Sequence, residues 1–313
     1  MTDIVVGVDG GGSKTRVIVA DETGWELAEA IGAGSATGPG RADESAAIIG
    51  ALVRQAMAEA GAENIRVRVL IAGIAGVGRV NEQRALAGAL EDLEIADDVI
   101  VEGDGDIALA DAFGDGAGII LISGTGSIAH GRSPNRVKAR CGGWGPSFGD
   151  EGSGSWIGRR ALAIVASAAD GREPATALTG SILTAAQVNE VTELIPWGIA
   201  ATPKELAQLA PVVFNCATSG DVRANALVGL AVEELVLHVR ALAIKLFLDE
   251  RAAVPLALTG GLLQKGSLLR KRLEQRLKSA VPGAAIRANE IIPARGAVWM
   301  AKYHLAHTEA AAR

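Results

Sequence analysis

Residues 7–16 read Gly7-Val-Asp-Gly-Gly-Gly-Ser-Lys-Thr-Arg16, with a carboxylate at the end of an apolar run and three glycines directly after it. Glycine has no Cβ, so its backbone N–H group can approach a phosphate oxygen closely. The Asp9 carboxylate adds the charge that a hydrated divalent cation needs. This stretch therefore predicts a phosphate-binding turn with a metal carboxylate beside it.

Two better-known phosphate loops are excluded by counting. A P-loop needs Gly, four residues, Gly and then Lys, but the residue after Gly12 is Ser13, and Lys14 comes one position late. The dinucleotide fingerprint needs a third glycine where Thr15 stands. A strand-like run over 15–20 and a turn over 21–24 follow, so we expect a β-hairpin at the phosphate site.

The same pattern returns about 115 positions later. An apolar run over 119–122 enters Ser123-Gly-Thr-Gly-Ser127, and a second strand-like run continues over 128–132. The segment 124–129 also fits the relaxed dinucleotide pattern, but Gly131 and Pro134 would break the helix which that pattern requires. The repeat predicts an internal duplication, with a nucleotide bound between the two halves.

Hydrophobic periodicity outlines the remaining elements. We expect helices over 43–60, 82–93, 104–112, 221–250, 268–278 and 294–307, a helix that begins near 155, and strands over 67–72, 98–101, 255–258 and 285–287. We expect an N-terminal lobe over 1–114, joined by the C-terminal helix 293–313, and a C-terminal lobe over 115–292.

Composition narrows the class of protein. The chain has 313 residues, 49% of them hydrophobic, and a net charge of −6 without a basic stripe, which argues against nucleic acid as the main partner. Cys141 and Cys216 form no C-x-x-C motif, and no secretory pattern is visible, so a reduced, cytoplasmic chain is expected. The apolar stretch 227–248 carries too many charges for a membrane span, so no membrane partner is expected.

Five segments occur together in a characteristic order. They are Asp9-Gly-Gly-Gly-Ser-Lys-Thr15, Asp104 after a strand, Ser123-Gly-Thr-Gly-Ser127, Gly142-Gly-Trp-Gly-Pro-Ser-Phe-Gly-Asp-Glu-Gly-Ser-Gly154 and Thr259-Gly-Gly261. Over nearly the whole chain they resemble the N-acetylglucosamine kinase branch of the BadF/BadG/BcrA/BcrD ATPase-like family, within the hexokinase, actin and heat-shock ATPase superfamily. The resemblance implies an α/β, two-lobed, duplicated ribonuclease-H-like fold with mixed sheets flanked by helices.

The resemblance also implies a role for individual residues. Asp9 would hold Mg²⁺ through water, and Asp104 would be the general base that takes the proton from the 6-hydroxyl of an amino sugar. The residues implied to bind ATP are Gly10, Gly11, Gly12, Ser13, Lys14, Thr15, Gly124, Thr125, Gly126, Gly220, Gly260 and Gly261. Those implied to contact the sugar are Thr37, Ser127, Ile128, Gly143, Trp144, Gly145 and Asp150. A homodimer is also expected.

Other interpretations fit parts of the pattern. Asp104 could be a helix N-cap, and Asp106 is a rival for the role of base. At Thr37 the family often has Asn, so N-acetylglucosamine, glucosamine, N-acetylmuramic acid and glucose all fit the sugar site. The alternative function is that of an ATPase activator of a 2-hydroxyacyl-CoA dehydratase-type system, but it needs closely placed cysteine ligands, which Cys141 and Cys216 do not supply. An actin-like scaffold is a third, weaker possibility.

Overall fold

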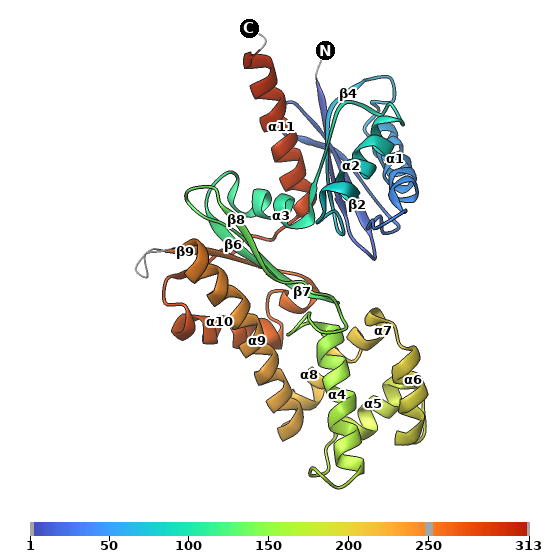
Figure 1. Ribbon diagram of the computed structural model, residues 1–313, viewed down its shortest axis with the longest axis vertical. Helices are drawn as coiled ribbons and strands as arrows, with labels where there is room; N and C mark the ends of the chain where they lie inside the picture. Colours follow the sequence, from blue (N-terminus) through green and yellow to red (C-terminus); the bar gives the residue numbers. More distant parts are fainter. Residues whose placement is uncertain (1–2, 248–252, 312–313) are drawn as a thin grey trace. The chain divides into compact units, whose positions relative to one another are not determined.

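The chain divides into two units in the computed structural model, which describes residues 3–247 and 253–311 (Figure 1). Unit 1 comprises Met1–Gly116 and Asn289–Arg313, and unit 2 comprises Ala117–Ala288. The last part of the chain therefore returns to the unit in which the chain begins.

Unit 1 is built on a mixed five-stranded sheet with the order β3-β2-β1-β4-β5. Its strands are β1 (Ile4–Gly10), β2 (Thr15–Asp21), β3 (Glu26–Gly32), β4 (Val67–Ile74) and β5 (Ala96–Gly103). The first three strands are antiparallel neighbours, whereas β1, β4 and β5 run parallel. Because both faces of β1 are covered, its sequence is an almost unbroken apolar run rather than an alternating one.

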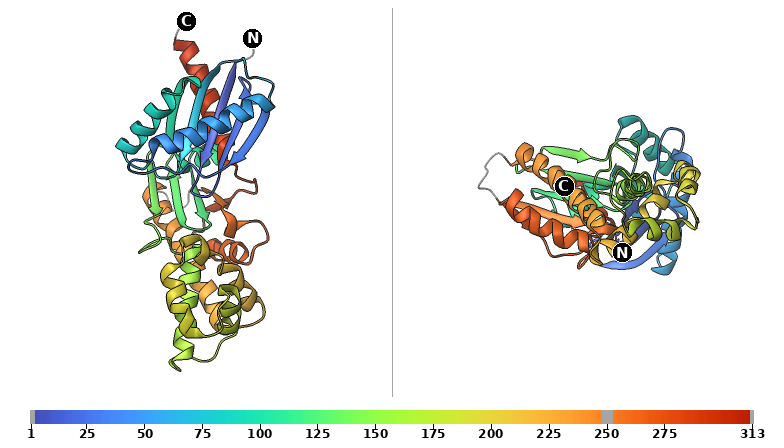
Figure 2. Two further views of the ribbon diagram at one scale, coloured as in Figure 1. Left: turned by 90° about the vertical axis from the view of Figure 1, so that its right-hand side faces the viewer. Right: turned by 90° about the horizontal axis from the view of Figure 1, so that it is seen from below.

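Helices cover the two faces of this sheet in pairs (Figure 2). On one face lie α1 (Ala42–Glu59) and α2 (Val80–Glu91), and on the other lie α3 (Asp104–Phe113) and α11 (Pro293–Ala311). Glycines allow the second pair to approach closely. A Cβ at Gly7 would overlap the backbone of α11, and a Cβ at Gly73 would overlap Ile107 of α3.

Unit 2 repeats this sheet. Its strands are β6 (Gly118–Ser123), β7 (Ser127–Arg132), β8 (Lys138–Gly142), β9 (Val254–Thr259) and β10 (Ala284–Ile286). The order β10-β9-β6-β7-β8, with β6 antiparallel to β7 and parallel to β9, repeats the arrangement of unit 1. The predicted duplication is therefore confirmed. Strand β8 is an addition, because the sequence analysis does not predict it.

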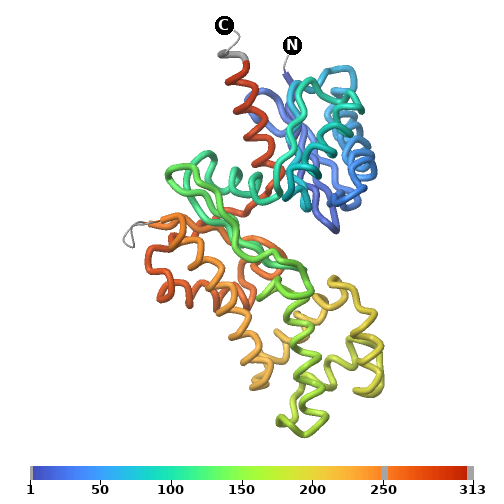
Figure 3. Tube along the Cα trace, in the orientation of Figure 1, coloured from blue at the N-terminus to red at the C-terminus, as the bar shows by residue number. Residues whose placement is uncertain are grey.

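The helices of unit 2 form one hydrophobic core with its sheet. Figure 3 shows the path of the chain through these helices. They are α4 (Gly154–Ala169), α5 (Leu178–Ala186), η1 (Val191–Glu193), α6 (Leu194–Ala200), α7 (Pro203–Ala207), α8 (Ala210–Thr218), α9 (Val222–Leu246), η2 (Gly261–Leu263) and α10 (Leu268–Ala280). The end expected for α9, near residue 250, lies outside the described residues. Within the described ranges, no helix has both the length and the hydropathy needed to cross a membrane.

Candidate functional site

Asp9 and Asp104 stand at one edge of the unit 1 sheet. Asp9 is the next-to-last residue of β1, where it pairs with Gly73 of β4, and Asp104 begins α3 directly after β5. Burial, followed by the nearby charge of Asp104, raises the pKa of Asp9 to about 6, although Lys14 and Arg16 act in the opposite direction. The structure thus brings the two predicted acids into one electrostatic environment.

Asp104 does not cap its helix. The N-cap residue of α3 is Gly103, which has no side chain to accept a hydrogen bond, and Asp104 is the first helical residue. Its Oδ1 atom accepts the N–H of Gly105 at 2.9 Å, and the side chain is partly exposed. The capping interpretation is therefore wrong. The remaining carboxylate oxygen can serve another partner, as a general base requires.

The first glycine turn joins β1 to β2. The N–H of Gly11 donates to the carbonyl of Lys14 at 3.0 Å, and the tip residues between them are exposed. Thr15 behaves differently, because its buried hydroxyl donates to the carbonyl of Ala33 at 2.7 Å and lies 2.8 Å from the hydroxyl of Ser35. The structure thus gives the Thr15 side chain an internal role. The exposed backbone of the tip is the part of this turn that can meet a phosphate.

Thr37 of unit 1 carries an unusual hydroxyl. Thr37 is only 9% exposed, yet its Oγ1 atom has no hydrogen-bond partner among the described residues. The backbone of Thr37 is fixed, since its N–H donates to the carbonyl of Ala75 at 3.0 Å. A buried hydroxyl without a partner destabilises a protein unless a ligand or water satisfies it. Thr37 therefore has the free donor and acceptor that a sugar-contacting residue needs.

In unit 2 the second glycine turn lies against the start of α4. The carbonyls of Gly124 and Thr125 accept the N–H groups of Gly154 and Ser155 at 2.8 and 3.2 Å, and Gly124 itself donates to Gly126 at 2.9 Å. These bonds fix the shape of the turn. Its backbone is therefore positioned before any ligand arrives, which is the condition for an anion-binding turn.

The glycines after β9 lie against the same turn. Gly260 has a φ of +100°, and a Cβ there would overlap the backbone carbonyl of Ser123. Gly261 also lies beside Gly124. Gly220 is elsewhere: it follows α8, with a φ of +94° and its N–H directed to Ala217, and no described hydrogen bond or ion pair joins it to this turn. That Gly220 binds ATP together with Gly260 and Gly261 thus stays a prediction.

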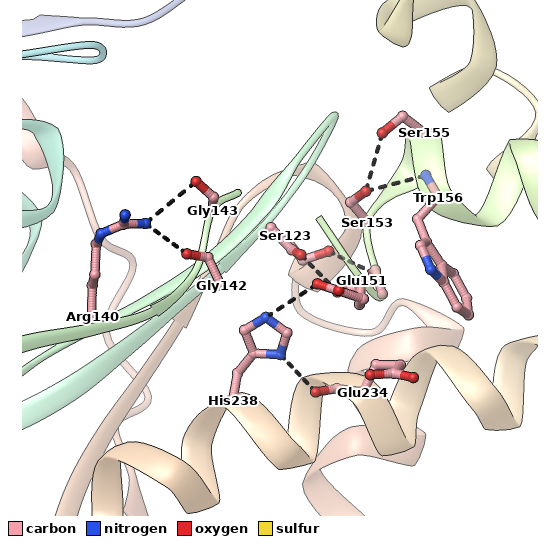
Figure 4. A network of polar contacts seen from close by, with 12 residues as sticks. Ser123, Arg140, Gly142, Gly143, Glu151, Ser153, Ser155, Trp156, Glu234 and His238 are labelled. Carbon is pink, nitrogen blue, oxygen red and sulfur yellow. Dashed lines mark hydrogen bonds and ion pairs between the residues drawn. The ribbon is translucent and has the colours of Figure 1, made fainter. Parts of the chain in front are cut away.

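The loop over residues 142–154, named here the tryptophan loop, is tied to the second turn (Figure 4). The hydroxyl of Ser127 donates to the carbonyl of Glu151 at 2.6 Å, and Ser123 donates in the same way to Gly152 at 3.0 Å. Asp150 accepts backbone N–H groups from Ser127 and Gly145, although burial dominates and raises its pKa. Turn and loop therefore form one hydrogen-bonded body within unit 2.

Ile128 and Gly143 complete this contact. The backbone N–H of Gly143 donates to the carbonyl of Ser127 at 3.0 Å. Gly143 has a φ of +68°, and a Cβ there would overlap the side chain of Ile128. The structure thus brings together all the residues of unit 2 that were predicted to contact the sugar.

Arg140 of β8 is a residue that the sequence analysis missed. Its Nη1 atom donates to the carbonyl of Gly142 at 2.8 Å, and its guanidinium lies 4.7 Å from the centre of the Trp144 ring. Trp144 is 62% exposed, and its contact with Arg140 therefore orients a large apolar ring that faces solvent. The only signal in the sequence is the alternation of β8, which places Arg140 on the opposite face of the strand from Cys141.

The two acids of unit 1, Asp9 and Asp104, suit a magnesium ion, which does not need to be enclosed by protein side chains. Within the described residues, no group of three or more His, Cys, Asp and Glu side chains could enclose a metal. Mg²⁺ commonly uses one or two carboxylates together with water and substrate phosphates. A cation beside Asp9 would also offset the unfavourable charge that Asp9 and Asp104 place together.

Comparison with known proteins finds relatives along nearly the whole chain, and their names are those of amino-sugar kinases. The chain is 31% identical to the N-acetylmuramic acid/N-acetylglucosamine kinase of Clostridium acetobutylicum, covering 95% of this chain and 98% of that one. It is 29% identical to the N-acetyl-D-glucosamine kinase of Dictyostelium discoideum, covering 96% and 98%. A crystal structure of a candidate N-acetylglucosamine kinase from Chromobacterium violaceum matches with a TM-score of 0.76 and 31% identity, covering 95% and 98%.

The two-unit α/β fold is also found in hexokinase-type sugar kinases of lower sequence identity. The predicted fold class is therefore confirmed. A family model matches residues 6–301, which include both glycine turns, Asp104 and the tryptophan loop. The chain belongs to the BadF/BadG/BcrA/BcrD ATPase family.

Proposed function

We propose that this protein is an ATP-dependent kinase that transfers the γ-phosphoryl group to the 6-hydroxyl of N-acetylglucosamine or a closely related amino sugar. The observation that carries the proposal is the pair of acids, Asp9 and Asp104, at the sheet edge next to the first glycine turn. The names of the relatives, which are about 30% identical along the full chain, support the same substrate class.

In this proposal the residues of unit 1 carry the chemistry. Asp104 takes the proton of the sugar hydroxyl as the hydroxyl oxygen forms its bond to the γ-phosphorus, and the bond from phosphorus to the β,γ-bridging oxygen breaks to leave ADP. Asp9 would hold Mg²⁺ through water, and the ion would supply neutralisation of the phosphate charge. The exposed backbone of the tip, Gly12–Lys14, offers N–H groups to the same phosphates.

The residues of unit 2 have proposed roles of their own. We propose that the turn Gly124–Gly126 binds phosphate oxygens and that Gly260 and Gly261 adjoin the nucleoside. The tryptophan loop would bind the sugar, with Asp150 accepting sugar hydroxyls and Trp144 packing on an apolar face of the ring. Asp150 has already used part of its accepting capacity on Ser127 and Gly145, which fixes its direction.

The test is a panel of sugars with coupled detection of ADP. N-acetylglucosamine, N-acetylmuramic acid, glucosamine and glucose are each offered with ATP and Mg²⁺. ADP release that depends on an amino sugar supports the proposal, and release that no sugar stimulates refutes it. Product analysis by nuclear magnetic resonance then shows whether the phosphate is on the 6-oxygen.

The alternative activator function receives no support from the cysteines. Cys216 lies buried in α8, where its Sγ atom contacts the hydroxyl of Ser181 at 3.4 Å, and Cys141 lies on β8. A bridging iron–sulfur cluster needs accessible, closely spaced thiolates. We therefore propose the kinase function alone.

We also propose a homodimer that forms through the exposed face of α9. Leu230, Leu237 and Ile244 recur every seven residues along this helix, and each is more than half exposed. Glu234 and Arg240 lie three positions on either side of Leu237. A second copy that runs antiparallel about Leu237 therefore meets opposite charges as well as apolar side chains.

Light scattering after size-exclusion chromatography tests this interface. Leu237→Glu should give a monomer, because it places two like charges at the symmetry axis. Ile199→Glu is the control, since Ile199 is 82% exposed on α6, away from the stripe. Equal masses for wild type and Leu237→Glu would refute the interface.

We expect the protein to work in the cytoplasm, where ATP is available.

A further inference from the structure

A buried imidazole supports the tryptophan loop from the side of α9 (Figure 4). His238 is 5% exposed. Gly142, the first residue of the loop, has a φ of +75°, and a Cβ there would overlap the imidazole ring. Only glycine therefore lets the loop backbone lie directly on this ring.

Each of the two ring nitrogens of His238 has an identifiable partner. Its Nδ1 atom lies 2.7 Å from the backbone carbonyl of Glu234, and because a carbonyl can only accept, Nδ1 must carry a hydrogen. The Nε2 atom lies 3.9 Å from Oε2 of Glu151. In the neutral ring Nε2 would then present a lone pair to a carboxylate. Only the imidazolium ion makes both contacts attractive.

Other titratable and charged groups lie near the ring. From the loop, Asp150 interacts with His238 as a second negative group beside Glu151. From β8, the thiol of Cys141 interacts with Glu151, and burial raises the pKa of that thiol. Arg140 leaves β8 on the opposite face from Cys141 and binds the loop there. The Nε2 atom thus faces the carboxylate of Glu151 with that of Asp150 nearby, and Lys245 of α9 is a cation near Cys141.

Glu151 connects this contact to the residues proposed to bind substrate. Its backbone carbonyl accepts the hydroxyl of Ser127, and its neighbour Asp150 accepts the N–H groups of Ser127 and Gly145. An attraction between Glu151 and α9 therefore acts on the same short segment that orients Asp150 and the second glycine turn.

We propose that His238 is a positioning residue whose imidazolium pairs with Glu151 and holds the tryptophan loop in its sugar-binding shape. Loss of the Nε2 proton to solvent converts the attraction into a repulsion and loosens the loop. The assignment of the loop to sugar binding rests on the proposed function, but the coupling between protonation and loop order does not. The predicted consequence is a KM for sugar that rises with pH, while the KM for ATP changes little.

Two substitutions separate the contacts of the ring. His238→Gln places an amide N–H₂ near the position of Nε2, so a neutral donor faces Glu151 at every pH. His238→Asn places the amide near Nδ1 and keeps only the contact with Glu234. A third variant, Glu151→Gln, removes the carboxylate and lets the neutral ring accept a hydrogen bond. His304→Gln is the control, because His304 forms a partly exposed pair with Asp98 in unit 1.

The experiment measures amide hydrogen exchange of residues 142–154 at pH 6 and pH 8, corrected for intrinsic exchange rates, in the absence of substrate. Wild type and the His304→Gln control should lose protection at the higher pH. His238→Gln and Glu151→Gln should show no pH dependence, and His238→Asn should be unprotected at both values. A pH dependence of wild-type size in His238→Gln, or none in wild type, overturns the proposal.

Kinetics with N-acetylglucosamine provide the second measurement. The sugar KM of wild type should rise about 5-fold or more between the two pH values, the lower end of typical coupling between sites, and that of His238→Gln should stay constant. If no sugar stimulates ADP release, the proposed function fails, whereas the exchange measurement still decides the role of His238. If His238→Asn does not fold, the two glutamine variants decide.

Discussion

Replacing Asp9 with Asn should stabilise the ligand-free protein while abolishing its activity. The pKa of Asp9 in the folded chain is about 6 against a usual value of 3.8, because burial and Asp104 both disfavour the charged form. A carboxyl whose folded pKa is raised binds its proton more tightly in the native state. Its ionisation therefore lowers the stability of the fold as the pH rises from about 4 through about 6.

The size of the effect follows from the shift. About two pKa units at 1.36 kcal/mol each give roughly 3 kcal/mol above neutral pH. Because the Asp9 side chain keeps some contact with solvent, this figure is an upper bound, and we expect about 1 to 3 kcal/mol. Asparagine has nearly the same shape and no charge, so Asp9→Asn should gain this amount at pH 8 and almost nothing at pH 4.

Urea unfolding at several pH values measures the difference. Circular dichroism and tryptophan fluorescence are followed together, because two units can unfold in separate transitions and only that of unit 1 should respond. Asp92→Asn is the control, since it removes the same charge from an exposed position. Parallel pH profiles for wild type and Asp9→Asn between pH 5 and pH 8 would refute the argument.

Three further changes test the site. Asp104→Asn should lower kcat by about 10²-fold or more while leaving nucleotide affinity nearly unchanged. Steady-state rates measure kcat, and titration calorimetry measures nucleotide affinity. If Asp106→Asn shows this effect instead, the base is Asp106. Thr37→Val should stabilise the ligand-free protein by about 1 kcal/mol and weaken sugar binding about 2- to 10-fold, and an unchanged sugar KM would exclude contact with Thr37. Gly73→Ala should destabilise unit 1 by about 1 to 3 kcal/mol in urea unfolding, because the new Cβ meets Ile107 of the helix that carries Asp104. The variant should also lose kcat. An unfolding midpoint equal to that of wild type would contradict the packing argument.

The sequence predicts the architecture well because each half begins with the same local signal. A buried apolar strand, a glycine turn and a second strand appear at Asp9 and again at Ser123, and both open a sheet with the same strand order. Strand β8 escapes prediction because it has only five residues, Lys138–Gly142, in which charged and small side chains alternate, and because its pairing with β7 depends on the fold.

The chemistry of the site is partly visible in the sequence. Asp9 lies near the carboxyl end of β1 and Asp104 directly follows β5. Because β1, β4 and β5 run parallel, these ends meet at the same side of the sheet, and the meeting of the two acids is predictable. The supports of the tryptophan loop are not, because His238 comes 96 residues after Gly142 and nothing in its neighbourhood indicates that Gly142 lies against its ring. The internal hydrogen bonds of Thr15 likewise depend on Ala33 and Ser35, which reach it through the fold.

The return of the chain to unit 1 sets the order in which the molecule can be completed during translation. One face of β1 packs against Ala294, Val298 and other apolar residues of α11, a helix that leaves the ribosome only after all of unit 2. Unit 2 is one continuous segment, so all of its core is available before that helix emerges. The nascent chain therefore carries a finished second half while the sheet that holds Asp9 still has an uncovered apolar face, which a chaperone can recognise.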